Sequence, residues 1–163
     1  MNKPHRKANR ILDFDYSQDG VYFITICTDK RRHILSSITK NGTVVLLPCG
    51  EIAKQLIEST NKKFSSVYID NYVIMPDHIH LLVRIETKPD IIANNFIQLP
   101  TIGTIVGWFK YQLTKEINQR LNTPGEKQLQ RSYYDHVIRN QQDYNEAFDY
   151  IAYNPLNWLK KGQ

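Results

Sequence analysis

The stretch VYIDNYVIMPDHIHLLVRI, residues Val67–Ile85, consists of two strand-like segments that are joined by a short turn. β-Branched and other apolar residues dominate both segments, while Pro76 and Asp77 between them are typical of a tight turn. Successive side chains of a strand point to opposite faces. One face of the second strand therefore carries Ile79, Leu81, Val83 and Ile85, and the other carries His78, His80, Leu82 and Arg84. We expect helices to cover the isoleucine face.

The segments around this pair of strands predict an α+β fold. Further strands are expected at 21–28 and 132–139, and helices at 50–64, 101–121 and 140–155. Asn41 and Gly42 precede an apolar run and predict a small hairpin. Asn140 is a candidate N-cap of the last helix, which we expect to end near Pro155. Without the hairpin and the last helix, the order βαββαβ is that of a ferredoxin-like fold with an antiparallel sheet.

Length and composition indicate one basic domain. The chain has 163 residues and a net charge of +5, which suits a polyanionic partner. Residues 1–19 look like a basic arm and residues 87–100 like a loop. Cys27 lies in an apolar strand and forms no CxxC pair with Cys49, so we expect a buried, reduced thiol. The polar N-terminus and the lack of a long apolar stretch predict a soluble cytoplasmic protein with no membrane partner.

His78 and His80 form a candidate metal site. Two imidazoles at positions i and i+2 of one strand face can bind a single cation. Imidazole favours Zn, Cu, Fe or Ni, but a site that oxygens and phosphate complete can also hold Mg or Mn. The simpler interpretation is two surface histidines without a ligand, and a two-residue motif does not decide between the two.

The last helix carries a second candidate group, Tyr150. The helix has an apolar stripe at Tyr144, Ala147, Phe148, Ile151 and Ala152. Tyr150 lies off this stripe, on the side of Asp143, Glu146 and Asn154, so core packing does not explain it. Asn154 follows Tyr150 by one helical turn. An ordinary exposed tyrosine, and an asparagine that merely ends the helix before Pro155, are equally consistent with the spacing.

Five stretches of the chain resemble the HUH single-tyrosine transposases, and among these most closely the REP-associated tyrosine transposases. In chain order, between about Arg10 and Trp158, they are FDYSQDGVYFITICTDKRRHIL, YVIMPDHIHLLV, IGTIVGWFK, RSYYDHVIRN and DYIAYNP. Many relatives have a tryptophan before the last strand where this chain has Leu129, a departure that concerns packing or DNA contacts. The resemblance implies a single transposase domain over residues 1–163.

The resemblance also implies a chemical role for each candidate residue. His78 and His80 would bind a divalent metal, Mg or Mn, with Asn154 completing the site. Tyr150, and not Tyr144 or Tyr153, would be the nucleophile. The implied activity is that of a metal-dependent endonuclease and strand transferase on single-stranded or hairpin DNA, acting through a 5′-phosphotyrosine intermediate. The protein would act as a monomer or a dimer.

Basic residues in or beside the matching motifs are candidates for binding DNA phosphates, although most exposed cations only interact with solvent. These candidates are Arg31, Arg32, Lys110, Arg131 and Arg139. His136 matches a histidine of relatives, and the expected strand gives it a packing role or a supporting role around the site as readily as a catalytic one.

Two other functions compete with the transposase. One is a domesticated, non-catalytic protein that binds DNA hairpins. The other is a metallohydrolase that uses the two histidines to activate water, but His5, His33 and His136 do not cluster as further ligands. By strand alternation, we expect Asp77 to point to the face opposite His78, unless the turn alters its direction.

Overall fold

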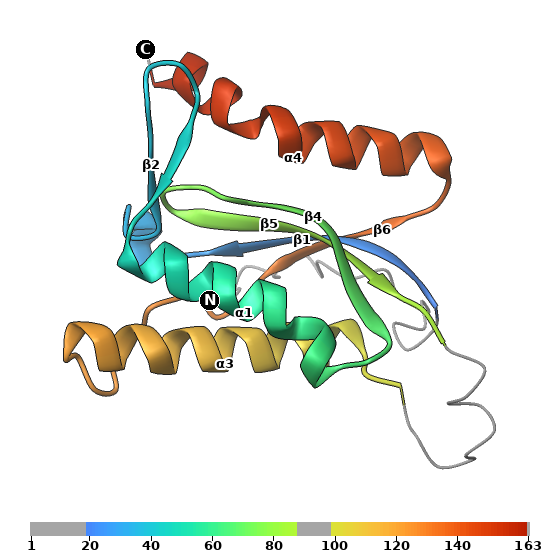
Figure 1. Cartoon of the computed structure of the whole chain (residues 1–163), viewed down its shortest axis with the longest axis horizontal. Coiled ribbons are helices and arrows are strands. Elements are labelled where there is room, and N and C mark those ends of the chain that lie inside the picture. The colour runs from blue at the N-terminus through green and yellow to red at the C-terminus, as the bar shows by residue number, and fades with distance from the viewer. Residues whose placement is uncertain (1–18, 88–98, 163) are drawn as a thin grey trace, which may run out of the picture.

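The computed structural model describes residues 19–87 and 99–162, which form three layers (Figure 1). The middle layer is an antiparallel sheet in the order β4-β5-β1-β6, made of Val67–Ile74, His78–Ile85, Gly20–Cys27 and Tyr134–Ile138. Helices α1 (Pro48–Lys63) and α3 (Ile102–Leu121) lie on one side of the sheet, and α4 (Gln141–Lys161) lies on the other. The ferredoxin-like βαββαβ order that the sequence predicts, with an added hairpin and last helix, is confirmed.

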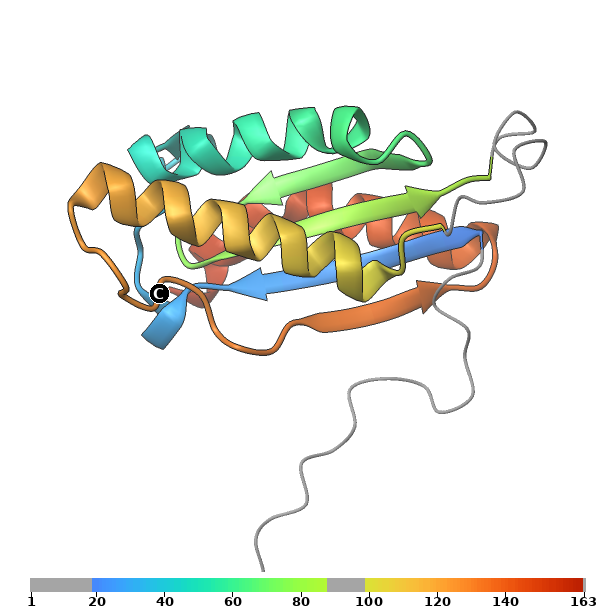
Figure 2. The same ribbon diagram turned by 90° about the horizontal axis from the view of Figure 1, so that it is seen from below.

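The main core lies between the sheet and the α1/α3 layer. Helices α1 and α3 run side by side across this face (Figure 2). Their buried apolar side chains meet the four residues of the predicted isoleucine face of β5: Ile79, Leu81, Val83 and Ile85. Burial of one such side chain contributes about 1.5–3 kcal/mol to stability. The side chain of Thr101 caps α3 by accepting a hydrogen bond from the backbone N–H of Thr104 at 3.1 Å.

Helix α4 covers the opposite face of the sheet, where the two histidines lie. Asn140 is its N-cap, as predicted, and accepts a hydrogen bond from the N–H of Asp143 at 2.8 Å. The expected end of the helix near Pro155 is wrong, because α4 continues to Lys161. A proline inside a helix costs about 3 kcal/mol, and here Ile151, Asn154 and Pro155 are buried, so packing against the sheet offsets the lost hydrogen bond.

The predicted hairpin is formed by β2 (Ser36–Ile38) and β3 (Val44–Leu46) and follows the short helix η1 (Asp29–Arg31). Gly42 in its turn has φ of 83°, a conformation that favours glycine. A Cβ atom on Gly42 would lie 2.4 Å from Cδ2 of Leu156. The tip of the hairpin therefore lies directly against the C-terminal half of α4.

Cys27 differs from its prediction, because its side chain is only half-buried at the end of β1. Cys49 is buried, and both thiols are free. The predicted basic arm, apart from Asp19, and most of the predicted loop at 87–100 lie outside the described residues. No helix in the described ranges is long and apolar enough to cross a membrane.

Candidate active site

Two rows of side chains across the sheet build the floor of the site beneath α4. Strand pairing aligns His80 of β5 with Thr25 of β1, and Thr25 with Tyr134 of β6. The neighbouring row aligns Phe23 with His136. Because alternate residues share one face, these side chains all face α4, while their neighbours along each strand enter the main core. The sheet register thus gathers residues that lie far apart in the sequence.

The two ring nitrogens of His80, in this floor, have different surroundings. Its Nδ1 atom is hydrogen-bonded to Oγ1 of Thr25 at 2.8 Å. Its Nε2 atom is buried and has no hydrogen-bond partner within the described part of the chain. Burial, together with His78 and Arg31 nearby, lowers the pKa of His80 to about 3, so the ring is neutral at pH 7. With the proton on Nδ1, the lone pair of Nε2 is available to a cation.

His78 lies beside His80 and is held by Asp77. The two imidazole ring centroids are 4.6 Å apart. The Nδ1–H of His78 donates to Oδ1 of Asp77 at 2.6 Å. Burial lowers the pKa of His78, an effect that the Asp77 carboxylate and a hydrogen bond with Asn154 partly oppose. A carboxylate on one ring nitrogen orients the other nitrogen, as it does in metal-binding histidines.

The turn alters the direction of Asp77, which does not point to the face opposite His78 as strand alternation alone would predict. The turn closes with a hydrogen bond from the N–H of Met75 to the carbonyl of His78 at 2.8 Å, and Asp77 lies within this turn. Residues of a turn do not follow the alternation of a strand, so the carboxylate reaches His78. Its second oxygen, Oδ2, pairs with Nε of Arg31 at 2.9 Å. Arg31 and Asp77 therefore both support His78.

Tyr150 and Asn154 approach the histidines from α4. The ring of Tyr150 lies 5.3 Å from that of His80 and 5.7 Å from that of Phe23, between centroids. The side chain of Tyr150 is 46% exposed, whereas Asn154 is buried. Tyr150 is therefore both open to solvent and next to the histidine pair.

The predicted apolar stripe of α4 is partly wrong. Phe148 and Ala152 are exposed, whereas Ile151 and Asn154 are buried. The helix is rotated so that Asn154 faces the sheet and Tyr150 lies at the edge of the sheet-facing side. An apolar stripe predicts the buried face of a helix from its apolar residues alone. It therefore does not predict the burial of an asparagine that faces a polar site.

The donor set fits a divalent cation. The described residues contain no cluster of three or more His, Cys, Asp or Glu side chains that could hold a metal ion. Two imidazoles and the amide of Asn154 would leave further coordination positions for phosphate and water. The buried Nε2 atom of His80 has no hydrogen-bond partner in the described part of the chain, and a bound cation would satisfy it.

Cationic side chains surround the histidines and Tyr150. A cavity of about 460 Å³ contains both histidines, and Arg31, Lys160 and Lys161 line it. Sequence reasoning missed its other lining residues, namely Thr25, Asn157, Trp158 and the two lysines. The missed residues of α4 follow Tyr150 and Asn154 at helical spacing as far as Lys161. This pattern extends beyond Pro155, where the sequence predicts the end of the helix.

The five basic candidates do not form one surface. Arg31 alone among them lines the cavity. Arg32 donates to Oε1 of Gln128 at 2.8 Å, and Lys110 on α3 donates to the carbonyl of Arg131 at 2.7 Å. Burial lowers the pKa of Lys110. The side chain of Arg139 is exposed next to the N-cap of α4. Arg32 and Lys110 thus hold the segment that precedes β6.

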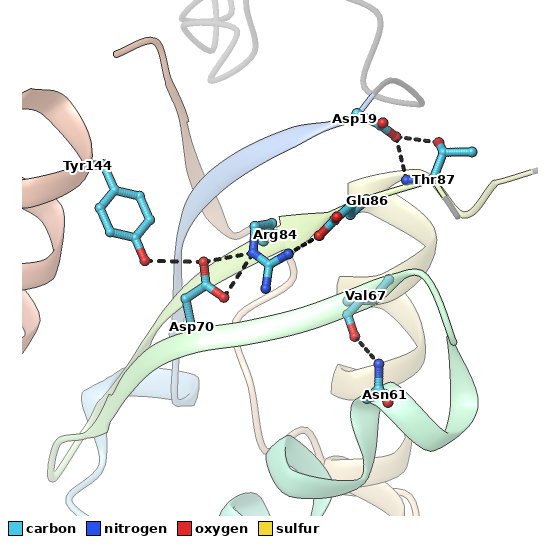
Figure 3. Close-up of polar contacts among 8 residues, drawn as sticks. All are labelled: Asp19, Asn61, Val67, Asp70, Arg84, Glu86, Thr87 and Tyr144. Atoms are coloured by element: carbon cyan, nitrogen blue, oxygen red, sulfur yellow. Dashed lines mark hydrogen bonds and ion pairs between the residues drawn. The ribbon is translucent and has the colours of Figure 1, made fainter. Parts of the chain in front are cut away.

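Two polar contacts hold the N-terminal half of α4 on the sheet. Nε2 of His136 lies 3.0 Å from each carboxylate oxygen of Asp143. The hydroxyl of Tyr144 donates to Oδ2 of Asp70 at 3.2 Å, and Nε of Arg84 donates to the same carboxylate at 3.1 Å (Figure 3). His136 and Tyr144 therefore position the helix that carries Tyr150.

Comparisons with known proteins identify the family to which the chain belongs. Residues 17–154 match the family model described as "Transposase IS200 like". An uncharacterized protein of Haemophilus influenzae is 33% identical over 165 residues, which cover 94% of this chain and 90% of that protein. A second H. influenzae protein, provisionally named a REP-associated tyrosine transposase, is 32% identical over 148 residues, or 87% of this chain and 73% of that protein.

A solved structure of a REP-associated tyrosine transposase bound to a REP hairpin shares the fold. The two chains superpose with a TM-score of 0.56, covering 96% of this chain and 74% of that chain at 19% identity. The family match spans the strands of the sheet and includes His78, His80, Tyr150 and Asn154. This confirms the resemblance that the sequence motifs indicate: the chain belongs to the IS200-like transposase family.

Proposed function

We propose that this protein is a metal-dependent endonuclease and strand transferase for single-stranded or hairpin DNA, with Tyr150 as its nucleophile. His78, His80 and Asn154 would bind the divalent metal, Mg or Mn. The observation that carries this proposal is the contact between an exposed tyrosine and a buried histidine with an unpartnered nitrogen, 5.3 Å apart between ring centroids.

The other tyrosines of α4 are less suited to the chemistry. The hydroxyl of Tyr144 is engaged by Asp70 and lies away from the histidines. Tyr153 is 59% exposed and does not line the histidine cavity. Tyr150 is partly exposed and lines that cavity.

In the proposed step, Oη of Tyr150 forms a bond to the phosphorus of the scissile phosphodiester. The bond between phosphorus and the 3′ oxygen breaks, and that oxygen keeps the electron pair and gains a proton, while the phenol loses one. The products are a 5′-phosphotyrosine and a free 3′-OH. Since the covalent bond conserves the phosphodiester energy, the reverse attack by a 3′-OH rejoins DNA without ATP.

A bound divalent metal supplies a positive charge that offsets the negative charge of the transition state. The chain's own contributions are distinct. Neutral His78 and His80 provide nitrogen ligands, and Asp77 orients His78. Arg31, Lys160 and Lys161 provide cationic groups for the neighbouring phosphates. Tyr150 lines the same cavity as both histidines and these three cationic side chains.

The hairpin form of the substrate is proposed from a relative. The solved tyrosine transposase with this fold is bound to a REP hairpin. A net charge of +5 and a cationic cavity of about 460 Å³ favour a nucleic-acid partner here as well. The attack also requires an accessible phosphate, which a single-stranded segment provides.

A covalent-adduct assay tests the proposal. Labelled single-stranded DNA from the flanks of the gene is incubated with the protein and Mg or Mn, and a protein–DNA adduct is sought on denaturing gels. We expect wild type and Tyr153→Phe to form the adduct and Tyr150→Phe to form none, because only the attacking oxygen is removed. An adduct with Tyr150→Phe would disprove the assignment. DNA binding without any adduct in wild type would favour a non-catalytic hairpin-binding protein.

A further inference from the structure

A second cavity adjoins Tyr150 and is distinct from the histidine cavity. It has a volume of about 320 Å³ and is lined by Phe23, Tyr134, His136, Asp143, Ala147 and Tyr150. Tyr150 is the residue that this cavity shares with the histidine cavity. Phe23 stacks on His80 with 5.1 Å between ring centroids and also lines the second cavity.

The exposure of Tyr134 is not explained by packing. Its neighbour in sequence, Tyr133, packs against the main core, whereas Tyr134 is 54% exposed on the α4 side of the sheet. Tyr134 occupies the open edge strand β6 and aligns with Thr25, the hydrogen-bond partner of His80. A large, half-exposed aromatic side chain thus lies in the same cavity lining as Tyr150.

The walls of the cavity combine flat rings with polar atoms. Three of its six lining residues are Phe or Tyr, and His136 and Asp143 supply polar atoms at its wall. Nε2 of His136 contacts the Asp143 carboxylate, and about two-fifths of the His136 side chain remains exposed (42%). Aromatic walls with a few polar groups suit a planar heterocycle with hydrogen-bonding edges, and nucleic-acid proteins stack bases on such rings.

We propose that this cavity binds the nucleobase of a nucleotide that adjoins the scissile phosphate, with Tyr134 as the stacking platform. The inference rests on the proposed function, because it uses Tyr150 as the point where the phosphate lies. Tyr150 lies between the histidine cavity and the second cavity. With the scissile phosphate in the histidine cavity at Tyr150, the base of the same or the next nucleotide would reach the second cavity. This base would fix the register in which DNA enters the site.

Binding measurements on an uncut complex test the proposal. The full chain carrying Tyr150→Phe is titrated with a DNA hairpin whose single-stranded flanks come from the DNA beside its gene. Each flank position is replaced in turn by an abasic nucleotide. We expect one position at which the loss of the base weakens binding about 10-fold. When Tyr134→Ala is added to Tyr150→Phe, the same abasic substitution should cause no further loss of affinity. When Tyr134→Phe is added instead, the abasic substitution should still weaken binding.

The control for Tyr134 is Tyr111, which is 65% exposed on α3 across the sheet, so Tyr111→Ala should leave the abasic profile unchanged. The proposal is wrong if every abasic position has the same effect with and without the Tyr134 ring. It is also wrong if the protein does not bind this DNA. A Tyr134-dependent position in a protein that forms no adduct would overturn only the cleavage activity, since this assay requires no chemistry.

Discussion

His78 and Asp77 are adjacent in sequence, yet their side chains form a buried hydrogen bond of 2.6 Å between Nδ1 and Oδ1. This contact occupies Nδ1 and fixes the ring, so Nε2 is the nitrogen of His78 that can bind a metal. We therefore expect Asp77→Asn to weaken Mn binding by about 10- to 100-fold while the protein stays folded. Isothermal titration with MnCl₂ measures this. Asp149→Asn, at an exposed position of α4, is the matched control. Equal affinities in all three proteins would show that Asp77 does not support a metal ligand.

Removal of His80 should abolish Mn binding. Its buried Nε2 atom has no hydrogen-bond partner among the described residues, so His80→Ala removes a ligand and one side-chain hydrogen bond, the one with Thr25. Tyr111→Ala serves as a comparison, because Tyr111 is exposed on α3 across the sheet from the proposed donor set, and this variant should bind Mn as the wild type does. Undiminished Mn binding by His80→Ala would rule out the proposed metal site.

The lysine pair at the end of α4 should contribute to the salt dependence of DNA binding. Each phosphate contact contributes about 0.7 to the slope of log affinity against log salt for single strands. Replacing Lys160 and Lys161 by Ala should therefore reduce the slope by about 1.4. Lys62 and Lys63 also end a helix, α1, on the other side of the sheet, and their double replacement controls for net charge. Equal slopes for both double variants would exclude the lysine pair from the DNA site.

Asp143 should make stability depend on pH at the acid end. The hydrogen bond from His136 lowers the pKa of Asp143 below its ordinary value of 3.8, and further contacts with Arg139 act in the same direction. A carboxyl with a lowered folded-state pKa stabilises the protein above the unfolded pKa, and the stabilisation is lost as the pH falls through the folded pKa. Urea unfolding should thus show wild type more stable than Asp143→Asn at pH 6, with the gap closing below about pH 4. A gap that does not vary with pH would contradict this.

Gly42 and Leu156 should show coupled effects on stability. Gly42→Ala places a Cβ 2.4 Å from Cδ2 of Leu156 at a φ of 83°, so it should destabilise the protein by about 1 kcal/mol or more. Leu156→Ala removes the clashing group and should recover part of this loss in the double variant. Denaturant unfolding of the four proteins gives the coupling energy. Strict additivity would mean that the hairpin tip does not rest on α4.

The sequence predicts the sheet well because strand alternation is a local property. The alternation in β5 correctly separates Ile79 and its neighbours from the histidines. The C-terminal end of α4 and its buried face were predicted less well. Pro155 is an ordinary stop signal, and its tolerance here depends on tertiary burial that the local sequence does not contain. The two lysines beyond it were missed for that reason.

The candidate site was predicted where its residues belong to motifs and missed where strand pairing or a turn brings them together. Thr25 reaches His80 through the register of β1 with β5. Asp77 reaches His78 because a turn breaks the strand alternation. Proximity to the motifs in the sequence makes the five basic residues candidates for DNA contacts. Proximity does not show, however, that Lys110 lies on α3 and donates a hydrogen bond to the carbonyl of Arg131. Such placements depend on contacts across the sheet.

The attachment of α4 to its own sheet has a kinetic consequence. The helix is held near its start by Tyr144 and Asp143 and near its end by the hairpin tip against Leu156, and Tyr150 lies between these attachments. We therefore expect every residue of the candidate site to come from one polypeptide. DNA cleavage by the assembled complex should follow first-order kinetics, with a rate constant that does not change when the enzyme is diluted at saturating DNA.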